Sequence, residues 1–124
     1  MTAKIEATGP FGDYDPVALP PAVVAYLDAR DQNRHADAVA TFAPDATVLD
    51  DGNTYLGVEA IGAWIESSSS EYAYTATRIG QHILDDTHAV VHVRLDGNFP
   101  GGTVTLRYQF EHRSGVIDRL AIKV

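Results

Sequence analysis

The feature that most constrains the fold is a succession of alternating apolar and polar residues in the second half of the chain. This pattern predicts four strands, at about 72–84, 88–96, 103–113 and 116–124. Residues typical of turns separate the strands: Asp85-Asp86, Asp96-Gly97 through Gly102, and Ser114-Gly115. Because successive side chains of a strand point to opposite faces, each strand carries one apolar and one polar-rich face. The second half is therefore predicted to form an antiparallel sheet with one buried face.

The first half carries helical spacing instead, and it predicts three helices. Pro20 and Pro21 favour the start of the first helix, which we expect to break near Asn33. Pro44 is expected to close the second helix, and Gly57 to precede the third. The residues at helical intervals are Val23, Tyr26, Leu27 and Arg30 in the first helix, Ala36, Val39, Ala40 and Phe42 in the second, and Val58, Ile61, Trp64 and Ile65 in the third.

A short strand, Ala46–Asp50, is predicted between the second and third helices. The two-residue period of a strand places Ala46, Val48 and Asp50 on one face, so a carboxylate shares a face with apolar neighbours. Helices followed by a run of antiparallel strands are typical of an α+β fold. We therefore expect three N-terminal helices packed on one face of a curved, mostly antiparallel sheet.

Composition and charge narrow the classes of protein to which the chain can belong. The length of 124 residues suits one hydrophobic core, and we expect an N-terminal arm over 1–16 and a single domain over 17–124. Nine Lys and Arg against 17 Asp and Glu give a net charge of −8, which disfavours nucleic acid and anionic membrane surfaces as partners. The sequence shows no secretory signal and no apolar run of about 18 to 20 residues, so a cytoplasmic location is expected.

No pattern for a metal or another cofactor is found. Cysteine is absent, which excludes Cys-ligated metals and a thiol nucleophile. On a strand, His88 and His92 lie about 13 Å apart, whereas the ligands of one zinc ion lie about 2 Å from it. The glycine-rich segment 97–102 lacks the lysine and the strand-to-helix context of a phosphate-binding loop. Neither a metal nor a cofactor is therefore expected.

Three segments of the chain are similar to segments of one known family: Phe42-Ala43-Pro44-Asp45-Ala46-Thr47-Val48, Leu56-Gly57-Val58-Glu59-Ala60-Ile61, and Ile117-Asp118-Arg119-Leu120-Ala121-Ile122. With the order helix, tight turn, helix and acid-ended strand over 26–51, they resemble the SnoaL-like, ketosteroid-isomerase-like branch of the nuclear transport factor 2-like superfamily. The resemblance covers about 20–124. It implies a cone-shaped, cystatin-like fold in which helices and a bent sheet enclose a largely apolar pocket, and it implies a homodimer.

The ketosteroid-isomerase pattern implies roles for three residues. Tyr26 stands where that pattern has a tyrosine that donates to an oxyanion, and Asp50 where it has an aspartate that moves a proton. Tyr108 stands where the pattern has an acid as second donor, so a phenol replaces the acid. Removing a proton beside a carbonyl leaves an enolate, whose oxygen needs preorganised donors. Each residue also has a structural interpretation: the two tyrosines as core aromatics, and Asp50 as the start of a turn.

The pocket that the resemblance implies is expected to bind a small, mostly apolar carbonyl compound. Its predicted lining residues are Val48, Trp64, Leu106, Phe110 and Asp118. The leading hypothesis is isomerisation with Asp50 as the base. Because the third acid is missing, a non-catalytic ligand-binding or dimerisation module is an alternative. A polyketide cyclase or dehydratase that uses Asp118 or His82 is another.

Overall fold

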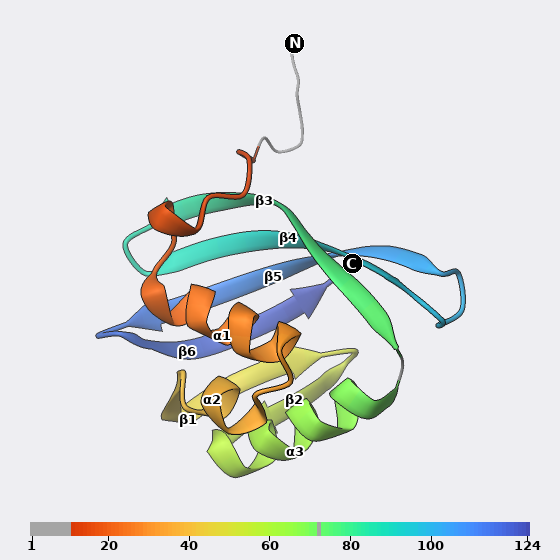
Figure 1. Ribbon diagram of the computed structural model, residues 1–124. Helices are drawn as coiled ribbons and strands as arrows, with labels where there is room; N and C mark the ends of the chain where they lie inside the picture. The colour runs from red at the N-terminus through yellow and green to blue at the C-terminus, as the bar shows by residue number, and fades with distance from the viewer. Residues whose placement is uncertain (1–10, 72) are drawn as a thin grey trace.

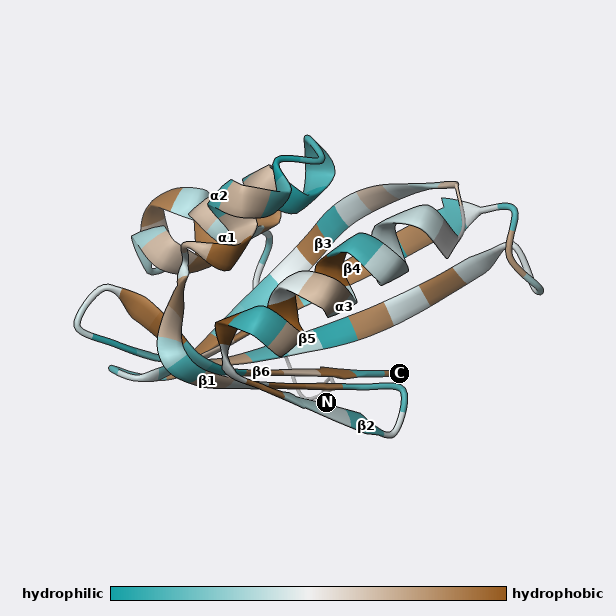
Figure 2. Cartoon of the chain, turned by 90° about the horizontal axis from the view of Figure 1, so that it is seen from below, coloured by the Kyte–Doolittle hydropathy of each residue, from teal (hydrophilic) through white to brown (hydrophobic). Residues whose placement is uncertain are grey.

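A six-stranded sheet forms the frame of the part of the protein that the computed structural model describes, residues 11–71 and 73–124. The strands lie in the order β2-β1-β6-β5-β4-β3 (Figure 1). The helices α1, α2 and α3 lie on the same side of this curved sheet (Figure 2). In chain order the elements are the 3-10 helix η1 (Pro16–Ala18), α1 (Pro21–Asp31), α2 (His35–Val39), β1 (Phe42–Asp50), β2 (Asn53–Leu56), α3 (Gly57–Glu71), β3 (Tyr74–Asp85), β4 (His88–Gly97), β5 (Thr103–Arg113) and β6 (Val116–Lys123).

The α+β architecture and the mostly antiparallel sheet agree with the sequence prediction. The four strands predicted in the second half are β3 to β6, and each is antiparallel to the next. β1 pairs with β2 antiparallel and with β6 parallel, so the sheet is mixed. The expectation of three N-terminal helices is confirmed only in part, because two strands, β1 and β2, precede α3 where one was expected, and α2 has only 5 residues.

The second helix is shorter than predicted, and the strand after it is longer. α2 ends at Val39, and Phe42 is already the first residue of β1, paired with Ile117 of β6. Pro44 therefore lies within a strand instead of closing a helix. It is exposed, and the register of β1 against β6 shifts between Phe42 and Thr47, so the missing N–H of proline interrupts no regular pairing.

The β1–β2 hairpin was not predicted, because β2 is short and mostly exposed. Its turn consists of Asp51 and Gly52, which both have positive φ angles, 52° and 78°. Two such residues make the tight turn that matches the twist of the flanking strands. The turn fixes the end of β1, where Asp50 pairs with Asn53.

The core lies between the helices and the inner face of the sheet. The helical spacing read from the sequence is confirmed, since Val23, Tyr26 and Leu27 of α1 and Ile61, Trp64 and Ile65 of α3 are buried. They meet a row of strand residues that is also buried: Val48, Leu120, Phe110 and Ala89, which pair across β1, β6, β5 and β4. The Tyr26 ring lies edge-on to the rings of Phe42 and Phe110, with centroids 5.4 and 5.9 Å away.

The described part of the predicted N-terminal arm packs on the sheet, whereas residues 1–10 lie outside the described residues. Gly12 exchanges two backbone hydrogen bonds with Gln81 of β3, of 2.8 and 2.9 Å. The Gln81 amide also bonds both backbone groups of Asp15, and the Phe11 ring stacks on His92 with centroids 3.9 Å apart. This segment therefore covers part of the outer edge of β3.

Phe11 and Gly12 lie so close to Gly80 of β3 that replacing this glycine is predicted to destabilise the protein. A Cβ atom at Gly80 would overlap the Phe11 ring and lie 2.9 Å from the carbonyl oxygen of Gly12. We expect Gly80→Ala to lower the free energy of unfolding by about 1–3 kcal/mol, measured by urea denaturation. Gly12→Ala is the matched control, since a Cβ there meets nothing within 4 Å. An equal loss in the two variants would contradict the prediction.

Candidate functional site

The Asp50 side chain is held in place by a residue of α3. Asp50 is the last residue of β1 and is half-buried on the inner face of the sheet. Trp64 Nε1 donates a hydrogen bond of 3.0 Å to Asp50 Oδ2. Among the described residues, no donor contacts the other oxygen, Oδ1. One carboxylate oxygen is thus anchored, and the other keeps its lone pairs available.

Asp50 and Tyr108 lie in one row across the inner face of the sheet. Asp50 pairs with Ile122, which pairs in turn with Tyr108. Two strand spacings therefore separate Asp50 from Tyr108, which is about 10 Å between backbones. Both side chains line a pocket of about 330 Å³, called the apolar pocket below. Its apolar walls are Leu95, Phe99, Pro100, Val104, Leu106 and Ile122.

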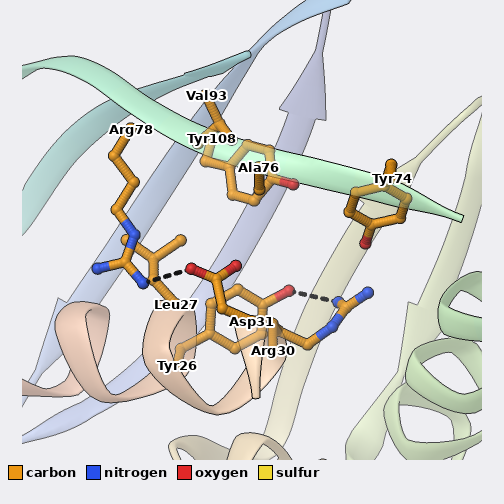
Figure 3. Close-up of a pocket in the computed structure, with 9 residues that line it drawn as sticks. All are labelled: Tyr26, Leu27, Arg30, Asp31, Tyr74, Ala76, Arg78, Val93 and Tyr108. Atoms are coloured by element: carbon orange, nitrogen blue, oxygen red, sulfur yellow. Dashed lines mark hydrogen bonds and ion pairs between the residues drawn. The ribbon is translucent and has the colours of Figure 1, made fainter. Parts of the chain in front are cut away.

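Tyr26 lies beside the apolar pocket and not on its wall. Its hydroxyl accepts a hydrogen bond of 2.8 Å from Arg30 Nη1, one turn further along α1. Both residues line a cavity of about 20 Å³, called the small cavity (Figure 3). Tyr74 and Tyr108 line the small cavity and the apolar pocket alike. The two spaces are therefore neighbours that share two phenol side chains.

Burial keeps the phenols of Tyr26 and Tyr108 in their protonated form. It raises the pKa of Tyr26 from 10.0 to about 12, although the cation of Arg30 acts in the opposite direction. Burial also raises the pKa of Tyr108, and the nearby Tyr26 adds to this effect. Among the described residues, none forms a hydrogen bond with the Tyr108 hydroxyl. Tyr108 can therefore donate to a ligand at neutral pH.

The other predicted lining residues take different places. Leu106 lines the apolar pocket. Val48 and Phe110 lie one row deeper and are buried in the core. Trp64 is also buried, where it orients Asp50. Asp118 does not reach the pocket, because its carboxylate forms an ion pair of 2.7 Å with Arg113.

Arg30 is a residue of the site that the sequence analysis did not single out. Its guanidinium carbon lies 4.9 Å from the centre of the Trp64 ring, and Nη2 donates to Ser68 Oγ over 3.0 Å. A signal for Arg30 was present in the sequence, since it occupies the helical position that follows Val23, Tyr26 and Leu27. A cation on an otherwise apolar helix face is a reason to expect a specific partner.

Two further findings concern the described residues only. No group of three or more His, Asp or Glu side chains among them is placed to hold a metal ion. None of their helices combines the length and the hydropathy needed to cross a membrane. His82 is exposed on β3, away from the apolar pocket.

Comparisons with known proteins identify a matching domain family and structures with the same fold. The profile of the SnoaL-like domain matches residues 23–115. A candidate polyketide cyclase from Sinorhizobium meliloti is 36% identical to this chain and has a TM-score of 0.83, with 89% of this chain and 100% of that chain covered. The comparison with curated proteins found no significant match.

Two more distant structures share the fold. A protein from Catenulispora acidiphila with a ketosteroid isomerase-like fold, solved with trimethylamine, is 19% identical, with a TM-score of 0.75 and coverage of 86% of this chain and 87% of that chain. A Mycobacterium tuberculosis protein solved with estradiol-17β-hemisuccinate is 17% identical, with a TM-score of 0.68 and coverage of 82% and 88%.

The raised pKa of Tyr26 predicts a loss of stability at alkaline pH. Tyrosine in the unfolded chain ionises near pH 10, whereas folded Tyr26 ionises near pH 12. Unfolding is therefore favoured progressively from about pH 10 to about pH 12, by at most about 3 kcal/mol.

Tyr26→Phe should reduce this alkaline decline, because phenylalanine has no proton to lose. The measurement is urea unfolding of both proteins at about pH 8 and about pH 11. Any constant loss of stability caused by the lost Arg30 contact cancels when the two pH values are compared. The same decline in both proteins would contradict the prediction.

Proposed function

Because the chain belongs to the SnoaL-like domain family and has a ketosteroid-isomerase-like fold, we propose that it binds a small, mostly apolar carbonyl compound in the apolar pocket and moves a proton on it. Asp50 is the base. The observation that carries this proposal is the placement of the Asp50 carboxylate, which Trp64 orients at the wall of a mostly apolar pocket that also contains the Tyr108 hydroxyl.

The proposed step is the isomerisation of a β,γ-unsaturated ketone. Oδ1 of Asp50 takes a proton from the carbon between the carbonyl and the double bond, and the C–H electron pair forms a dienolate. The dienolate oxygen accepts a hydrogen bond from Tyr108, and Tyr26, which lines the small cavity with Tyr108, is the second donor. Return of the proton from Asp50 to the γ carbon gives the conjugated ketone and restores the carboxylate. The low polarity of the pocket strengthens these hydrogen bonds.

Cyclisation of a polyketide-like chain is a second candidate, favoured by the 36% identical relative. An intramolecular aldol reaction also begins with removal of a proton beside a carbonyl, so the base and the donors have the same roles. Asp118 and His82 are less suited to this role than Asp50, since Asp118 is paired with Arg113 and His82 is exposed.

A non-catalytic binding module is the third candidate. It is favoured by the phenol of Tyr108 at a position where the ketosteroid-isomerase pattern has an acid. Tight binding of a ketone by the wild-type protein without formation of product would support this candidate against the other two.

The test is the turnover of a β,γ-unsaturated ketone by the wild type and by Asp50→Asn. The amide cannot take the proton, so kcat/KM should fall by about 10²–10⁴-fold. Tyr108→Phe should reduce kcat by about 10²–10³-fold, because it removes an oxyanion donor. Asp118→Asn is the matched control and should retain the wild-type rate. Equal rates for the wild type and Asp50→Asn would refute the proposed base.

A further inference from the structure

Arg30 is a cation that the described part of the protein does not neutralise. Among the described residues, no carboxylate lies within ion-pair distance of it. Its hydrogen-bond partners are the hydroxyl groups of Tyr26 and Ser68, and its guanidinium carbon lies 5.8 and 4.9 Å from the ring centres of Tyr26 and Trp64. Its Nε is buried without an acceptor. A charge that is even half-buried is costly when it lacks a counter-ion, so the presence of Arg30 calls for a reason.

Arg78 of β3, a neighbouring arginine, is neutralised by acids of α1, the helix that carries Arg30. Asp28 and Asp31 of α1 each form an ion pair of 2.9 Å with Arg78 Nη2. Tyr14 accepts a further hydrogen bond from Arg78. Asp31 lies next to Arg30 in the chain, yet its carboxylate turns to Arg78 (Figure 3). The acids of α1 thus neutralise Arg78 and leave Arg30 unpaired.

Three spaces meet around the Tyr74 side chain, and Arg30 lines two of them. Arg30 lines the small cavity and an open hollow of about 470 Å³, called the polar hollow. Tyr74 lines both of these and also the apolar pocket. Its side chain extends from β3 toward Arg30 and is 40% exposed (Figure 3). A ligand that lies along Tyr74 can therefore span from the apolar pocket to Arg30.

We propose that the compound bound in the apolar pocket carries a carboxylate and that Arg30 binds this carboxylate. The inference rests on the proposed function, because it places the apolar body of the ligand in the pocket of Asp50. A guanidinium has five donors, of which two are used here, by Tyr26 and Ser68. Its planar fork matches a carboxylate in geometry and charge.

Asp50 and Arg30 then fix the direction of the ligand, since the Asp31 carboxylate beside Arg30 is paired with Arg78. A carboxylate near Asp50 would be repelled, whereas near Arg30 it is attracted. The indole of Trp64 lies between Asp50 and Arg30. Its N–H donates a hydrogen bond to Asp50, and the guanidinium of Arg30 lies over its ring. The carboxylate therefore points to Arg30, which leaves the reacting carbonyl near Asp50 and Tyr108.

The test compares two probes of nearly the same shape, 4-phenylbutanoate and 5-phenyl-2-pentanone, which differ by a negatively charged oxygen in place of a methyl group. Binding is followed by the fluorescence of Trp64, the single tryptophan of the chain, and by calorimetry. We expect the wild type to bind the carboxylate about tenfold or more tightly than the ketone. Arg30→Met should weaken carboxylate binding by about 10–100-fold and ketone binding by less than about threefold.

Two further variants make the test specific for Arg30. Arg30→Lys retains the charge and loses the planar fork, so it should bind the carboxylate with an affinity between those of the wild type and Arg30→Met. Arg94→Gln is the matched control, since Arg94 is exposed and paired with Asp96 on the outer face, and both probes should bind it as they bind the wild type.

The possible failures are distinguishable. If the wild type binds both probes equally well, or if Arg30→Met weakens both to the same extent, the carboxylate proposal is wrong while the ketone-binding pocket stands. If the wild type binds neither probe, the pocket itself is refuted as a site for such compounds, and both proposals fail.

Discussion

The parallel pairing of β1 with β6 is the constraint on which the site depends. It joins the first half of the chain to the sheet formed by the second half, and it places Asp50 beside Ile122. The register is fixed two residues earlier in each strand, where buried Val48 of β1 pairs with buried Leu120 of β6. A slip of one residue along β1 would expose Val48 and turn Asp50 to the outer face. The same apolar contacts that stabilise the fold therefore aim the carboxylate into the pocket.

Much of the fold could be predicted because burial repeats with a regular period. The alternation of apolar and polar residues predicted β3 to β6, and helical spacing predicted the buried faces of α1 and α3. The two-residue period also placed Asp50 on the face of Val48, and Asp50 does line the apolar pocket. Family resemblance supplied the pocket itself, which no periodicity in the sequence could indicate.

Other features could not be predicted, because the regular spacing of buried residues is interrupted or absent in the segments that form them. β2 has four residues that are mostly exposed, so it shows no alternation. Asp118 shares the two-residue period of Leu120, yet the register of β6 against β5 shifts at this point, and the side chain pairs with Arg113. Phe42 follows a helical pattern but is buried at the start of β1 by contact with Tyr26. Such local shifts depend on tertiary contacts that a single sequence does not display.

Trp64 lies between Asp50 and Arg30, two groups of opposite charge. An acid and an arginine that met directly would neutralise each other, which would weaken Asp50 in its proposed role as a base. Trp64 prevents this, because its N–H binds Asp50 while its ring faces Arg30. A neutral aromatic side chain thus contacts both charged groups, one through a donor and one through its π face, and neutralises neither. Trp64 thus keeps the Asp50 carboxylate and the Arg30 guanidinium apart, and both the proposed proton transfer and the proposed binding of a carboxylate require this separation.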